Sequence, residues 1–175
     1  MKAASINDLK QELQALPHKK LLEVTLKLAK FKKENKELLS YILFDADNEQ
    51  GYIESIKIEM DEQFAELPKA NWYLAKKGLR KILRSISKYS KHTATKESEL
   101  EMLLHFCKNV QSSGLPIQRH KVLTSLYEMQ LKKLNSLSGQ VHEDLRYDYK
   151  RQIEQLEQHK EASSVVAKVV NIFKR

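Results

Sequence analysis

The six histidines of this 175-residue chain are the first candidates for chemistry, because imidazole is a common metal ligand. None belongs to a His-Glu-x-x-His pair, none has the Glu three positions earlier that a di-iron helical bundle uses, and no Cys-x-x-Cys occurs. Glu101 and His105 stand one helical turn apart, where both side chains could reach one ion. We interpret them as an ordinary surface pair and predict no metal ion and no other cofactor.

The single cysteine, Cys107, would need a neighbouring base and a thiolate-stabilising environment to act as a nucleophile. It lies instead in an apolar stripe, which predicts a buried core residue. The stripe is formed by Leu100, Leu103, Leu104, Cys107 and Val110. The four glycines are isolated, so no glycine-rich loop can cradle a phosphate. We therefore predict no catalytic residue, and an enzyme of an unrecognised type remains a distant alternative.

Charge is distributed unevenly along the chain. Residues 45–66 contain eight acids and one base, whereas residues 67–96 contain nine bases and no acid. The overall net charge of +8 therefore comes mostly from one segment. Such a segment is typical of proteins that bind nucleic acid or acidic protein surfaces.

Seven of these bases fall in one sector, about 140° wide, of a helix over residues 71–89 and just beyond. This basic face consists of Lys76, Lys77, Arg80, Lys81, Arg84, Lys88 and Lys91. It is the candidate site for an anion or a macromolecular partner. Two other interpretations stay open: the face is only solvated, or the acidic helix before it pairs with it. Nearby aromatic residues, namely Trp72, Tyr73 and Tyr89, could equally stack bases or anchor the core.

Helical periodicity and capping residues predict the elements that position these side chains. Ser5, Asn71 and Thr95 are candidate N-caps, as is either Asp47 or Asn48. Pro17, Pro68 and Gly114 are candidate ends. The expected helices cover residues 5–16, 17–33, 38–44, 48–67, 71–89, 95–113, 118–137 and a segment from 140 onward. We find no convincing strand.

The later helices begin about 22 to 25 residues apart with short turns, so successive helices should pack antiparallel. The sequence predicts an all-α fold of helical hairpins, either an irregular bundle or a short HEAT-like solenoid of helical repeats. We expect one domain over residues 1–175, with residues 163–175 as a C-terminal helix extension or tail.

Several leucine-rich segments are similar to a bacterial all-helical family of unknown function. They are Leu9-Lys10-Gln11-Glu12-Leu13, Leu21-Leu22-Glu23-Val24, Asn35-Lys36-Glu37-Leu38-Leu39 and Leu103-Leu104-His105-Phe106-Cys107. The resemblance implies an all-helical bacterial protein. It implies no activity, substrate or binding residue.

Neither a signal peptide nor a membrane span is indicated, because the longest nearly unbroken apolar run, residues 38–44, is far below the roughly 20 residues that cross a bilayer. With one cysteine and no internal disulfide, we predict a cytoplasmic protein. The expected function is a non-enzymatic binding or scaffold module for another macromolecule, with a protein partner and no membrane. The alternative is a nucleic-acid-binding protein that uses the helix at residues 76–91.

Overall fold

The computed structural model describes residues 2–172, with side chains as far as Lys160. All regular structure in this part of the chain is helical, which confirms the predicted all-α fold. Backbone contacts divide the chain into two compact units between Asp47 and Asn48. The expectation of one domain over residues 1–175 stays a prediction.

The first unit contains three short helices followed by two helical turns. The helices are α1 (Ile6–Ala15), α2 (His18–Phe31) and α3 (Lys33–Ser40), and the turns are a π-helical turn at Tyr41–Asp45 and a 3-10 turn at Ala46–Asn48, which ends just past the boundary of the unit. Ser5 is the N-cap of α1, as predicted, and it forms a reciprocal capping box with Asp8. The apolar helix expected at residues 38–44 is divided instead, since α3 begins earlier and ends at Ser40.

The first unit has almost no buried core. No residue of α1, α2 or α3 is buried, and Tyr41 is the one buried residue that the described part of this unit contains. Large apolar side chains lie at the surface, among them Ile6 with 81% of its area exposed and Phe31 with 75%. The amphipathic segments of this unit therefore form helices, but their apolar stripes are not buried.

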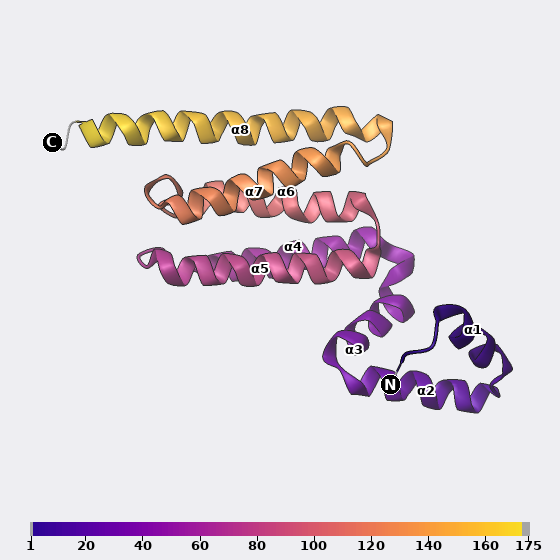
Figure 1. Cartoon of the computed structure of the whole chain (residues 1–175). Coiled ribbons are helices and arrows are strands. Elements are labelled where there is room, and N and C mark those ends of the chain that lie inside the picture. The colour runs from indigo at the N-terminus through magenta and orange to yellow at the C-terminus, as the bar shows by residue number, and fades with distance from the viewer. Residues whose placement is uncertain (1, 173–175) are drawn as a thin grey trace. The chain divides into compact units, whose positions relative to one another are not determined.

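The second unit is a set of antiparallel helices joined by short turns (Figure 1). Its elements are α4 (Glu49–Ala65), α5 (Trp72–Thr93), α6 (Lys96–Ser112), a 3-10 turn (Ile117–Arg119), α7 (Lys121–Ser138) and α8 (Glu143–Ile172). Helix α6 contacts α4, α5, α7 and α8, so it forms the centre of the unit. The predicted extension at residues 163–175 falls partly within α8, and residues 173–175 lie outside the described part.

The core of this unit is built on α6. Phe106 is fully buried, and its ring centre lies 5.4 Å from that of Phe64 on α4. Cys107 is also fully buried, and this desolvation raises the pKa of its thiol far above the ordinary value. The prediction that Cys107 is a core residue is confirmed.

Side-chain caps set the starts of three helices. The side chains of Asn48, Asn71 and Thr95 accept hydrogen bonds from the first turns of α4, α5 and α6, as predicted. Helix α5 continues to Thr93, about one turn past its expected end. No helix in residues 2–172 is long and apolar enough to cross a membrane.

Candidate functional site: the basic face of α5

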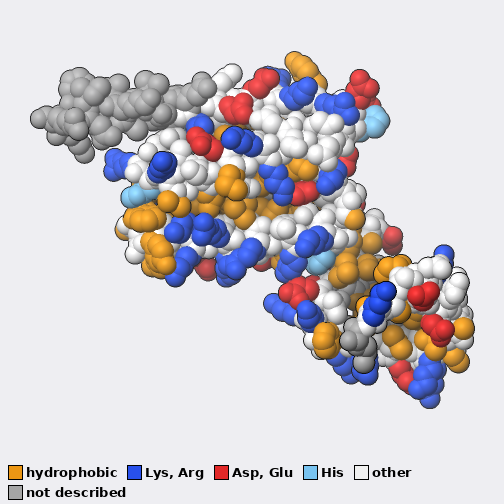
Figure 2. All heavy atoms as spheres, in the orientation of Figure 1, with side chains coloured by type: hydrophobic (Ala, Val, Ile, Leu, Met, Phe, Trp, Pro, Cys, Tyr) orange, Lys and Arg blue, Asp and Glu red, His pale blue; other side chains and the backbone are white. Residues whose placement is uncertain are grey.

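Helix α5 has one buried side and one charged side. Its buried side chains, Ala75, Leu79, Ile82 and Ile86, recur at helical spacing and hold the helix against the core. The basic face lies on the remaining surface. Lys77, Arg80, Lys81, Arg84 and Lys91 are exposed, while Lys76 and Lys88 are half-buried. Figure 2 shows Lys and Arg side chains gathered along α5, with apolar side chains beside them.

The five exposed bases have no carboxylate partner among the described residues. Among the residues that the structure describes, no ion pair includes Lys77, Arg80, Lys81, Arg84 or Lys91. Like charges one turn apart on a helix repel by a few tenths of a kcal/mol per pair. The apolar side of α5 holds the helix in place against this repulsion, and the positive charge stays at the surface.

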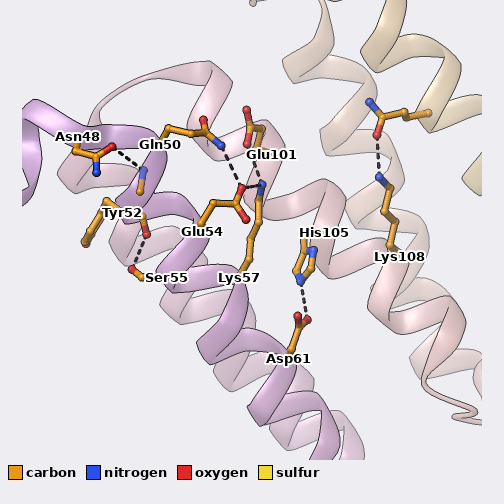
Figure 3. A network of polar contacts seen from close by, with 12 residues as sticks. Asn48, Gln50, Tyr52, Glu54, Ser55, Lys57, Asp61, Glu101, His105 and Lys108 are labelled. Carbon is orange, nitrogen blue, oxygen red and sulfur yellow. Dashed lines mark hydrogen bonds and ion pairs between the residues drawn. The ribbon is translucent and has the colours of Figure 1, made fainter.

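Several acids of α4 have other partners. Lys57 Nζ lies 2.7 Å from Glu54 Oε1 and 3.0 Å from Glu101 Oε2 on α6 (Figure 3). Asp61 Oδ1 lies 2.6 Å from His105 Nε2, also on α6. Glu59 accepts a hydrogen bond from the Tyr89 hydroxyl at 3.0 Å. The interpretation in which the acidic helix neutralises the basic face is therefore wrong for its five exposed bases.

Aromatic rings lie at the N-terminal end of the basic face. The Trp72 indole stacks on the His120 imidazole, with ring centres 4.9 Å apart and planes 18° apart. Tyr73 is 46% exposed, and the ammonium groups of Lys76 and Lys77 each lie 4.7 Å from its ring centre. Such distances are those of cation–π contacts. Trp72 packs on the core, whereas Tyr73 faces solvent.

The positive surface extends beyond the seven bases of the basic face. Arg119 and Lys121, which flank His120, are also exposed. Because His120 stacks on Trp72, these two bases lie near the start of α5. Antiparallel packing accounts for this position, since α5 and α7 are two helices apart and begin at the same end of the unit.

A polar network joins α4, α6 and α8, and Figure 3 shows its contacts between α4 and α6. Burial alone would lower the pKa of the Lys57 amino group, but hydrogen bonds to Glu54 and Glu101 outweigh it and raise this pKa. The hydrogen bond from Lys57 lowers the pKa of the Glu54 carboxyl. Burial, with the charge of Glu101, raises the pKa of Tyr149 to about 12. The network pairs complementary groups and stabilises both charges of each pair.

The pair Glu101 and His105 does not converge on a common point. The Glu101 carboxylate binds Lys57 and the Tyr149 hydroxyl, while His105 binds Asp61. Within residues 2–160, no group of three or more His, Cys, Asp or Glu side chains is arranged to hold a metal ion. The two residues act in separate contacts between helices.

No protein-family model, curated protein or solved structure matches this chain. The resemblance to a bacterial all-helical family stays a prediction.

Proposed function

We propose that this chain is a non-enzymatic binding module for another macromolecule, and that an anionic partner docks on the basic face of α5. One observation carries the proposal. Five bases that share one side of a helix are exposed and form no ion pair among the described residues. An anionic partner would relieve their mutual repulsion and release counterions when it binds.

The position of these bases supports docking without refolding. Residues on the opposite side of α5, such as Leu79 with none of its area exposed, hold the helix against the core. The charged groups are thus presented by a rigid element, which lowers the entropy lost on binding. Nucleic acid and an acidic protein surface are the two partners that such a face fits.

The test uses a triple variant, Arg80→Gln with Lys81→Gln and Arg84→Gln. Fluorescence anisotropy at about 50 mM salt would measure binding to a thymidine oligonucleotide of about 16 nucleotides, a duplex of matched length and poly-glutamate. We expect the wild-type protein to bind at least one of these polyanions, and the triple variant to bind it at least about tenfold more weakly.

A matched control separates location from net charge. Lys19, Lys27 and Lys30 on α2 are exposed, and no ion pair within the described residues includes them. Changing all three to Gln removes the same charge, and we expect binding to fall by less than about threefold. Equal losses in the two triple variants would contradict docking on α5. A wild-type protein that binds none of the polyanions would contradict the proposed function.

A further inference from the structure

We infer that the anionic partner is single-stranded nucleic acid, with its phosphates along the basic face and a base stacked on Tyr73. This inference rests on the proposed function and narrows it to one class of partner. It is carried by the juxtaposition of an exposed ring, two ammonium groups that contact it and five exposed bases on the same helix that form no ion pair among the described residues.

The length of the basic face suits a polyanion that makes several contacts. From Lys76 to Lys91 the helix rises by about 22 Å, and bases recur along this whole length. A nucleic-acid strand carries a negative charge on every nucleotide, so successive phosphates can contact successive bases of the face.

The aromatic rings at the start of α5 offer a stacking surface for unpaired nucleobases, which a single strand has and a duplex lacks. Bases of a single strand are free to stack on side-chain rings, whereas those of a duplex are already stacked on each other. Tyr73 is 46% exposed, and its ring is in contact with the ammonium groups of Lys76 and Lys77. A nucleobase that stacks on Tyr73 would displace one of these ammonium groups from the ring. The displaced ammonium group would then lie beside the phosphate that flanks the nucleobase.

The stack of His120 on Trp72 shows that flat rings can pack on each other at the start of α5. The imidazole of His120 lies parallel to the Trp72 indole, and the Trp72 and Tyr73 ring centres are 6.1 Å apart. Arg119 and Lys121 on either side of His120 are exposed, so they could contact phosphates that continue past Tyr73. The path of a strand therefore runs from the exposed bases of α5 toward the start of α7.

The experiment measures the affinity of the wild-type protein for four probes at about 50 mM salt. The probes are the thymidine oligonucleotide, the matched duplex, poly-glutamate and vesicles of phosphatidylcholine with phosphatidylserine. We expect the oligonucleotide to bind at least about tenfold more tightly than the other three. Equal or tighter binding of the duplex, of poly-glutamate or of the vesicles would overturn the inference and leave the proposed function standing.

Variants of Tyr73 test the stacking step. Tyr73→Leu removes the ring, and we expect it to weaken oligonucleotide binding by about 5- to 150-fold, with an unchanged salt dependence because no charge is lost. Tyr73→Phe keeps the ring and should bind like the wild type. Tyr147→Leu is the matched control, because Tyr147 is an exposed tyrosine on α8.

The triple variant supplies a second readout. Replacing Arg80, Lys81 and Arg84 with Gln should flatten the slope of log affinity against log salt by about 2, since each phosphate contact on a single strand contributes about 0.7. An unchanged slope would overturn both the inference and the proposed docking surface. Normal binding by Tyr73→Leu together with a flattened slope would overturn the stacking step alone.

Discussion

Helices α4 and α5 both pack on α6, yet their charges have opposite outcomes. On α4, Lys57 and Asp61 reach across to Glu101 and His105 on α6. On α5, the exposed bases reach no acid in the described residues. Among the described residues, the acids of α4 thus do not neutralise the five exposed bases of α5, although the two helices are adjacent in the chain.

The difference follows from how charge is distributed around each helix. On α5 the apolar and basic residues occupy separate sides, so burying one side exposes the other. On α4 charged residues also flank the apolar side, where Lys57 is half-buried and meets α6. A helix whose apolar and charged residues lie on separate sides presents its charge to partners, whereas part of the charge of α4 forms ion pairs within the fold.

The largest expected effect concerns the buried side of α5. Leu79 has none of its area exposed, so Leu79→Ala should lower the free energy of unfolding by about 2 to 5 kcal/mol. Urea denaturation followed by far-UV circular dichroism would measure it. A loss below about 1 kcal/mol would mean that α5 does not depend on this side for its position.

A smaller effect is expected for the network of α4. The Lys57 side chain is 18% exposed and binds two carboxylates, so Lys57→Gln should lower the free energy of unfolding by about 1 to 3 kcal/mol. Arg80→Gln on α5 is the control, and we expect a change within about 0.5 kcal/mol. Equal losses would remove the contrast between the two helices.

The contribution of Lys57 should also depend on pH. Its raised pKa means that the stabilisation is present below the ordinary lysine value and is lost as pH rises through the folded-state value. The lowered pKa of Glu54 means that its share is present above the ordinary glutamate value and is lost as pH falls. The stability difference between wild type and Lys57→Gln should therefore be largest between about pH 5 and pH 10. A difference that does not vary with pH would contradict this pairing.

The smallest effect on stability is expected for the basic face. Replacing Arg80, Lys81 and Arg84 with Gln breaks no ion pair in the described residues and removes repulsion. The free energy of unfolding should stay within about 0.5 kcal/mol of the wild type or rise slightly. A loss above about 2 kcal/mol would show that these bases have partners within the fold.

Local signals in the sequence predict much of this fold. Ser5, Asn48, Asn71 and Thr95 start helices because a short polar side chain satisfies free backbone amides next to it. The side of α5 that carries the bases also follows from helical periodicity alone.

Contacts between helices could not be predicted from such local sequence signals. The stacking of His120 on Trp72 joins residues far apart in the chain, and it depends on how the helices pack. The partners of Asp61 depend on the orientation of α6. In α1 to α3 the apolar stripes form helices as expected, but periodicity does not show whether a stripe finds something to pack against.

The most direct test of docking on α5 is lysine footprinting. The protein would be acylated with an acetyl ester with and without a saturating thymidine oligonucleotide at about 50 mM salt, and each lysine would be quantified by mass spectrometry. We predict at least about threefold protection of Lys77, Lys81 and Lys91, with Lys19, Lys27 and Lys30 of α2 unchanged. Protection confined to α2, or spread equally over both sets, would contradict a docking surface on α5.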